Sequence, residues 1–295
     1  MKIENSFPGK DVSAEDLRSK FPLAAKQHPT HQTIVNVGGA EIGGREIVTM
    51  MGPNLVENSD MIFTIAKWAK ENKVSMLRGG CFKPLTFPYR GEKYFETGLE
   101  GLKWLSRAGS EYGLPVVTEA VSESQVELVA EHADMIQIGT RNMQNFPLLS
   151  TAARTMKPIL LKRGFGASLR DFMGAAEYIL LEGNSSLVLC ERGVVAPHTH
   201  RATSRFLLDL QIIPAAKEIT HLPIITDPSH ATFWAPWVKA LALASIAAGA
   251  DGVMIETHID PENAAVDPLQ PLNLEQSTDL VGALKSLADV VRGIN

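Results

Sequence analysis

Short apolar runs alternate with amphipathic stretches along most of the 295 residues. The runs are rich in Val, Ile and Leu and lack polar alternation, which is typical of strands buried on both faces of a parallel sheet. Eight of them are present, at residues 47–54, 74–80, 115–120, 134–140, 158–164, 186–193, 223–230 and 252–258. The intervening stretches, such as SESQVELVAEHA and WVKALALASIAAGA, have the composition and length of helices.

Eight strand–helix units in about 250 residues predict an α/β fold, a (β/α)8 TIM barrel. The alternative is an open doubly wound sheet, which ordinarily has fewer strands, and no convincing GxGxxG follows the first run. Residues 1–31 are predicted to form an N-terminal extension with one short helix, because Ser13 followed by Asp16 suits an N-cap. Residues 32–295 would form the barrel domain, and TIVNVGGAEIGGREIVTMM at its start predicts a β-hairpin that closes the bottom.

Composition narrows the class of protein. The chain is 45% hydrophobic and 21% charged with a net charge of −5, which argues against nucleic-acid and membrane partners. Its two cysteines, Cys81 and Cys190, form neither a disulfide framework nor a CxxC site, so a reducing cytoplasm is expected. No run resembles a signal peptide or reaches the roughly 18 residues that span a bilayer.

Charged residues gather where the predicted strands end, and in a barrel these ends form one mouth. Six cations lie at or after the ends of four of the strands: Arg78, Lys83, Arg141, Lys162, Arg163 and Arg192. They would repel one another unless an anionic ligand lay between them. Forked guanidinium groups suit a phosphate and a carboxylate in one small molecule. Each cation taken alone is equally well explained as a solvated surface residue, but a basic set at successive strand ends predicts a small anionic substrate.

A second polar group comprises His230, Glu256 and Asp267. One imidazole and two carboxylates can hold a divalent cation or transfer a proton. Spacing along the chain fixes no geometry, so hydrogen bonding within DPSH and helix capping by Asp267 remain alternatives. The HTH sequence at 198–200 fits either a metal pair or a mobile loop, and Cys190 is interpreted as a packing residue.

Seven motifs carry a resemblance to a known family: RGGCFKPLT, VVTEA, ADMIQIGTRNMQNF, KPILLKRGF, LVLCERG, LPIITDPSHA and GVMIETH. Over roughly residues 32–290 the chain resembles the short 3-deoxy-7-phosphoheptulonate (DAHP) synthases and the related 3-deoxy-8-phosphooctulonate (KDO8P) synthases. The resemblance implies a (β/α)8 barrel that assembles as a homotetramer or homodimer. It also implies a reaction that joins phosphoenolpyruvate to an aldose phosphate and releases inorganic phosphate.

The resemblance assigns roles to the cations. Arg141, Lys162 and Arg192 would bind the phosphate of phosphoenolpyruvate. Arg78 and Lys83, together with Lys162, would lie near its carboxylate, and Lys83 would also reach the aldehyde oxygen. Fixed cations of this kind stabilise a leaving phosphate without having to reorganise.

The same resemblance assigns the remaining polar residues. Glu119 would order the water that attacks the enolpyruvyl C2, and His230, Glu256 and Asp267 match three of the four metal ligands of metal-dependent members. Those members read GPC where this chain reads GPN, so Asn54 replaces the thiolate ligand. An amide is a poorer ligand than a thiolate, and metal-independent KDO8P synthases carry asparagine there. We therefore expect no required cofactor, the alternatives being a weak Mg²⁺ or Mn²⁺ site or a displaced thiolate from Cys81.

A second departure concerns the acceptor. DAHP synthases read Lys-Pro-Arg-Thr, where the arginine binds the phosphate of erythrose 4-phosphate. The predicted acceptor-binding residues of this chain are Pro84, Leu85, Thr86 and Phe87. Leu85 offers no donor to a phosphate, so the acceptor is expected to be an aldehyde other than erythrose 4-phosphate.

Two alternatives stay open from the sequence. The chain is an ordinary DAHP synthase if Arg90 or another loop residue replaces the missing arginine. It is a catalytically silent homologue if the site binds only an anion or a partner protein, although the intact set of cations argues against this. Only about 30 residues precede the hairpin, so no feedback inhibition by aromatic amino acids is expected.

Overall fold

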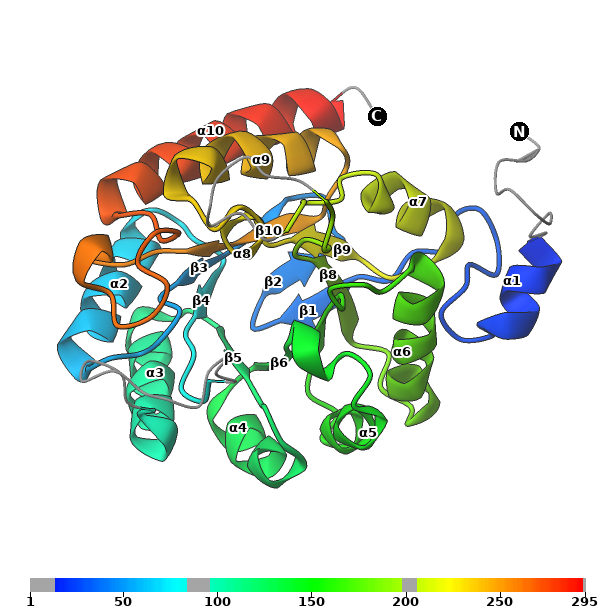
Figure 1. The fold of residues 1–295 in the computed structure, drawn as a ribbon, viewed down its shortest axis with the longest axis horizontal. Helices are drawn as coiled ribbons and strands as arrows, with labels where there is room; N and C mark the ends of the chain where they lie inside the picture. Colours follow the sequence, from blue (N-terminus) through cyan, green and yellow to red (C-terminus); the bar gives the residue numbers. More distant parts are fainter. Residues whose placement is uncertain (1–13, 84–95, 198–205, 294–295) are drawn as a thin grey trace.

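The computed structural model describes residues 14–83, 96–197 and 206–293. Eight parallel strands close into a barrel in the order β10-β3-β4-β5-β6-β7-β8-β9, as seen end-on in Figure 1. The strands are β3 Val48–Gly52, β4 Met76–Arg78, β5 Val116–Glu119, β6 Met135–Ile138, β7 Ile159–Lys162, β8 Leu187–Glu191, β9 Ile224–Thr226 and β10 Gly252–Glu256. Each lies within one of the eight apolar runs, so the predicted (β/α)8 barrel is confirmed.

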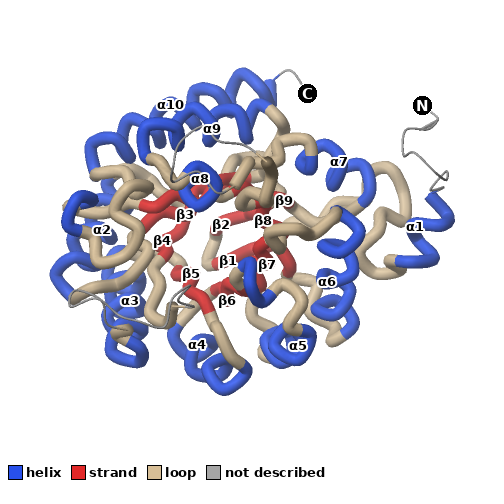
Figure 2. Tube along the Cα trace, viewed as in Figure 1, coloured by secondary structure: helices blue, strands red, loops and turns tan. Residues whose placement is uncertain are grey.

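Helices surround the strands, as the colours of Figure 2 show. They are α2 Ser59–Glu71, α3 Gly98–Tyr112, α4 Val126–His132, α5 Phe146–Arg154, α6 Leu169–Leu181, α7 Ile212–Ile219, α8 Pro228–Thr232, α9 Ala235–Ala247 and α10 Leu274–Gly293. Their starts follow from capping chemistry. The Asn58 side chain accepts the Met61 N–H at the start of α2, and Ser168 and Asp171 form a reciprocal capping box at α6. None of the described helices is both long and apolar enough to cross a bilayer.

The barrel interior is filled by apolar side chains and is closed by the hairpin. The hairpin strands are β1 Val35–Val37 and β2 Ala40–Ile42, which pair antiparallel. Val35, Val37 and Ile42 belong to the same buried cluster as inward residues such as Met50 and Met135. The predicted hairpin is therefore confirmed as part of the core.

The described N-terminal segment is fastened to the barrel rather than separate from it. Helix α1 Ala14–Lys20 forms where a short helix was expected. Downstream, Ala25 forms an isolated bridge with Thr220, and Lys26 N donates to Ile219 O at 2.8 Å. The proposed cap residue Ser13 lies outside the described residues. So do the acceptor loop 84–87, Arg90 and the HTH sequence at 198–200.

Candidate active site

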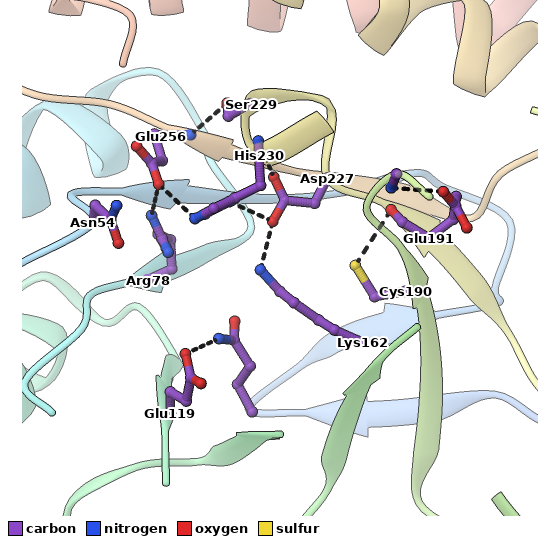
Figure 3. A network of polar contacts seen from close by, with 12 residues as sticks. Asn54, Arg78, Glu119, Lys162, Cys190, Glu191, Asp227, Ser229, His230 and Glu256 are labelled. Atoms are coloured by element: carbon purple, nitrogen blue, oxygen red, sulfur yellow. Dashed lines mark hydrogen bonds and ion pairs between the residues drawn. The ribbon is translucent and has the colours of Figure 1, made fainter. Parts of the chain in front are cut away.

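Strand ends bring charged side chains from distant parts of the chain to one mouth (Figure 3). Arg78, Glu119, Lys162 and Glu256 are the last residues of β4, β5, β7 and β10. Arg192 directly follows β8. All five are buried, with 0% to 8% of their surface exposed. The fold thus places the predicted residues together at the end of the barrel where barrel enzymes bind their substrates.

Three of these side chains, together with Asp227 and His230, form one ion-pair chain. Lys162 Nζ lies 2.5 Å from Asp227 Oδ2, which lies 2.7 Å from His230 Nδ1. On its other side, His230 Nε2 lies 2.9 Å from Glu256 Oε1, and Arg78 Nη1 lies 3.4 Å from the same oxygen. One imidazole therefore joins two buried carboxylates, and each carboxylate also faces a fixed cation.

Asp227 is the member of the ion-pair chain for which no role is predicted from the sequence. Its side chain accepts the His230 N–H at 3.1 Å and so caps the short helix α8, with Pro228 at the first helical position. The cap places Asp227 and His230 side by side. The available signal is the DPSH sequence directly after a strand, for which hydrogen bonding within DPSH is one of the alternatives open from the sequence.

The ion-pair chain shifts the acidity of its carboxylates. Burial alone would raise the pKa of Glu256, but the charge of His230, its hydrogen bond and the charge of Arg78 lower that pKa to about 2. Burial would likewise raise the pKa of Asp227, yet His230 and Lys162 hold it well below its usual range. Both carboxylates are therefore ionised at neutral pH, which suits a site that accepts or returns a proton through His230.

This depressed pKa predicts a pH-dependent stability. A carboxylate whose pKa is lowered on folding stabilises the protein above its unfolded pKa and loses that contribution as the pH falls through the folded value. For Glu256 the window runs from the ordinary 4.5 down to about 2. The difference in unfolding free energy between the wild type and Glu256→Gln should shrink by about 3 kcal/mol across this window.

Urea unfolding at several pH values measures that difference. Glu182→Gln is the control, because Glu182 forms an ion pair with Arg154 whose side chains are 29% and 57% exposed. Exposed pairs contribute little to stability. Wild-type and Glu256→Gln curves that stay parallel across the window would contradict the buried ion-pair chain.

Lys83 and Asn54 form the next contact group. Lys83 Nζ donates to the Asn54 backbone oxygen at 3.1 Å and to its side-chain oxygen, while Asn54 Nδ2 donates to Asp267 Oδ2 at 3.0 Å. Burial lowers the pKa of Lys83, and the charge of Glu119 opposes that shift. A Cβ on Gly80 would lie 2.3 Å from the Asn54 backbone oxygen, so the glycine in the RGG sequence permits this close approach. The Asn54 amide thus links an ammonium to a carboxylate.

These contacts bear on whether the site could hold a metal. Within the described residues, no three His, Cys, Asp or Glu side chains are grouped as metal ligands would be. The Asn54 oxygen accepts from Lys83, so a divalent cation there would have to displace an ammonium. Burial also raises the pKa of Cys81 to about 12, so this residue stays a thiol at neutral pH. The donor set therefore fits a divalent metal poorly.

Glu119 is held at the mouth by Gln137, a neighbour for which no role is predicted from the sequence. Gln137 Nε2 donates to Glu119 Oε2 at 2.8 Å. The other carboxylate oxygen passes close to Gly139, where an added Cβ would lie 2.0 Å away. Gln137 lies on β6 and pairs in register with Glu119 of β5. Nothing in its sequence context distinguishes it from a packing residue.

The arginines divide into two kinds. Arg163 Nη1 contacts Glu191 Oε2 at 2.9 Å and Asp209 Oδ2 at 2.8 Å, so the prediction that its charge awaits an anionic ligand is wrong. Arg192 instead lies beside aromatic rings, and burial lowers its pKa, an effect that nearby Arg141 reinforces. Two neighbouring guanidinium groups are suited to binding a phosphate.

Buried cations, an imidazole between two carboxylates and a barrel mouth together define an enzyme site for a small anionic substrate. The chain belongs to the DAHP synthetase I family, whose model matches residues 23–292. The predicted family resemblance is confirmed.

Individual relatives agree with this assignment. Phospho-2-dehydro-3-deoxyheptonate aldolase of Thermotoga maritima is 40% identical over 271 residues, which cover 92% of this chain and 78% of the relative. A 2-dehydro-3-deoxyphosphooctonate aldolase of Syntrophobacter fumaroxidans is 28% identical over 86% of this chain and 91% of its own. The crystal structure of the Thermotoga maritima enzyme superposes with a TM-score of 0.86, at 40% identity over 92% of this chain and 77% of that one. A truncated form of 3-deoxy-D-arabino-heptulosonate 7-phosphate synthase from that organism gives 0.84, at 39% identity over 92% and 98%.

Proposed function

We propose that the protein condenses phosphoenolpyruvate with an aldehyde, forming a carbon–carbon bond and releasing inorganic phosphate. The observation that supports this most strongly is the buried cationic mouth, in which Arg78, Lys162 and Arg192 are 4% to 6% exposed. Arg78 and Lys162 each face a buried carboxylate, whereas Arg192 Nη1 has no hydrogen-bond partner within the described residues. A phosphate bound at the mouth would supply that partner. Phosphate release that requires both phosphoenolpyruvate and an aldehyde tests the proposal.

The geometry supports a distribution of roles. Arg141, Lys162 and Arg192 hold the phosphate of phosphoenolpyruvate, and Arg78 faces its carboxylate. The enolpyruvyl C3 attacks the aldehyde carbon, whose oxygen takes its proton from Lys83. This ammonium is poised to give up a proton because burial lowers its pKa.

Water completes the reaction. Attack by C3 leaves positive character at C2, and a water molecule ordered by Glu119 adds there. In this proposal its proton passes to Glu119 or to the His230 imidazole. The C2–O bond then breaks, and phosphate leaves with the bridging oxygen, stabilised by cations that are already in position.

Metal independence is part of the proposal, and it gives a prediction. The contacts of Asn54 with Lys83 and Asp267 support a site that works by hydrogen bonds and proton transfer. We expect turnover to survive overnight treatment with EDTA with less than about a twofold loss, since no ligand set would be emptied. The measurement is initial rate after removal of the chelator and metal analysis of the same sample. Complete loss of turnover that Mn²⁺ or Mg²⁺ restores would contradict it.

The acceptor is the second part of the proposal and rests on residues outside the described part of the chain. Leu85 stands where family members have an arginine, and Phe87 adds apolar surface. A hydrogen bond to a charged group contributes roughly 1.5–3 kcal/mol, so erythrose 4-phosphate should bind at least about 10- to 100-fold more weakly than to an arginine-bearing site. An aldehyde with an uncharged or apolar distal end is favoured instead.

Leu85→Arg tests this. We expect the variant to lower the Michaelis constant for erythrose 4-phosphate by about 10-fold or more and to leave that for phosphoenolpyruvate unchanged. Arabinose 5-phosphate and unphosphorylated aldehydes complete the panel. The 40% identity to a heptonate aldolase favours the alternative of an ordinary DAHP synthase. That alternative is correct if the wild type uses erythrose 4-phosphate with a micromolar Michaelis constant and Leu85→Arg brings no gain.

A further inference from the structure

Two aromatic rings lie against the arginines of the mouth. Phe165 and Phe206 stack with their centroids 4.7 Å apart and their planes 9° from parallel. The Arg192 guanidinium carbon lies 4.3 Å from the Phe206 centroid and 5.0 Å from that of Phe165. The Arg141 guanidinium carbon lies 5.4 Å from the Phe165 centroid. All three separations are within the roughly 6 Å range of a cation–π interaction.

The partners of Arg192 differ in kind from those of Arg163. Arg163 donates hydrogen bonds to Glu191, to Asp209 and to the Ala167 backbone oxygen. Arg192 Nη1 is buried and has no hydrogen-bond partner within the described residues. An aromatic ring attracts a cation without accepting its N–H groups as a carboxylate does. The rings thus stabilise the Arg192 charge and leave donors for a ligand.

The chain after β8 is built to bring Phe206 back to Arg192. Gly193 has a φ of +97°, and a Cβ there would lie 2.8 Å from the Phe206 Cβ, so this turn needs glycine. Val194 and Leu207 then exchange two backbone hydrogen bonds of 2.9 Å each. This bridge holds Phe206, which precedes Leu207, close to Arg192, which directly follows β8.

The base of the same loop is tied by the Arg163 group. Glu191 Oε1 accepts the N–H groups of Gly193 at 2.6 Å and Asp209 at 3.3 Å. Arg163 contacts the side chains of both Glu191 and Asp209. Arg163 therefore has a structural role, in which it closes the loop that carries Phe206.

We infer that Phe165 and Phe206 form an aromatic platform that positions Arg192 and Arg141 for the phosphate of phosphoenolpyruvate, an inference that rests on the proposed function. The two guanidinium groups carry like charges, which repel each other at short range. The shared Phe165 ring offsets that repulsion and holds both groups at one place before the anion arrives. Such preorganisation lowers the cost of binding without adding a direct contact to the ligand.

Phe206→Leu tests the platform, with Phe206→Tyr as the conservative variant. We expect Phe206→Leu to raise the Michaelis constant for phosphoenolpyruvate and the dissociation constant of inorganic phosphate by about 10-fold each. The Michaelis constant for the aldehyde should not change, and Phe206→Tyr should restore binding to within about twofold because it keeps the ring. Phe146→Leu is the matched control. Phe146 also takes part in a stacked ring pair, because its centroid lies 4.2 Å from that of Tyr178, but this pair does not involve Arg141 or Arg192.

Binding of phosphoenolpyruvate and of inorganic phosphate by calorimetry, without any aldehyde, separates the possible failures. If the wild type binds phosphoenolpyruvate and Phe206→Leu binds it equally well, the platform is wrong and the proposed function stands. The effect is structural, and the platform is again wrong, if Phe206→Leu raises the Michaelis constant for the aldehyde as much as that for phosphoenolpyruvate. The same conclusion follows if Phe206→Tyr weakens phosphoenolpyruvate binding as much as Phe206→Leu does. If the wild type binds neither anion, the proposed function and the platform both fail. Should Phe206→Leu unfold, Phe165→Leu replaces it with the same expected results.

Discussion

Replacing Lys162 by methionine should lower kcat/KM for phosphoenolpyruvate by about 100- to 1,000-fold, the loss typical of removing one fixed donor from a developing anion. Lys162 is 4% exposed and lies 2.5 Å from Asp227, which is fully buried. Methionine fills much of the same volume but leaves Asp227 with His230 as its remaining ion-pair partner. Breaking a buried pair in this way also costs about 3–5 kcal/mol of stability.

Steady-state kinetics and urea unfolding on the same preparation measure both effects. Lys157→Met is the matched control, because Lys157 lies just before the start of the same strand and donates to the Ala133 backbone oxygen. It should change kcat/KM by less than about threefold, since its strand end faces away from the mouth. Equal kinetic losses in the two variants would contradict the assignment of Lys162 to the phosphate.

Replacing His230 by glutamine should reduce kcat by about 100- to 10,000-fold, the range for a group that moves a proton in the transition state. Glutamine can still form hydrogen bonds toward Asp227 and Glu256, but it carries no charge and transfers no proton at neutral pH. The Michaelis constant for phosphoenolpyruvate should change by less than about fivefold, because the phosphate ligands are other residues.

His221→Gln controls for the loss of a buried histidine. His221 lies before the start of β9, whereas His230 lies after its end. The His221 ring forms hydrogen bonds with Thr33 Oγ1 and the Leu23 backbone oxygen, both at 2.7 Å. It should lower stability and leave kcat nearly unchanged. A His230→Gln enzyme that keeps wild-type kcat, or loses only phosphoenolpyruvate affinity, would rule out proton transfer by this residue.

Sequence alone was sufficient for the barrel because its strands are buried on both faces. That burial produces the continuous apolar runs, of which LVLCE in β8 is one, and every residue of that strand is buried. The cations at strand ends followed directly, since parallel strands in a closed barrel end at one mouth. The position of Arg78 and Lys162 at the barrel mouth is therefore predictable from the sequence.

The ion pairs between side chains at the strand ends could not be predicted from the sequence. Arg163 and Lys162 are adjacent and both basic, yet one is neutralised by Asp209, 46 residues later in the chain, and the other by Asp227. Phe206 reaches Arg192 only because a glycine turn and a backbone bridge fold the chain back. Chain spacing carries no information about such contacts, because they depend on the path of a loop. The aromatic platform gave no recognisable sequence motif for the same reason.

We propose that this site joins phosphoenolpyruvate to an aldehyde with cleavage of the C2–O bond. Phosphoenolpyruvate carrying a heavy oxygen label at its bridging position tests it most directly, with mass spectrometry of the phosphate and of the organic product. We expect phosphate release only when an accepted aldehyde is present, one phosphate for each condensation product, and the label in the phosphate. Phosphate released without aldehyde, or a label retained in the organic product, would contradict it.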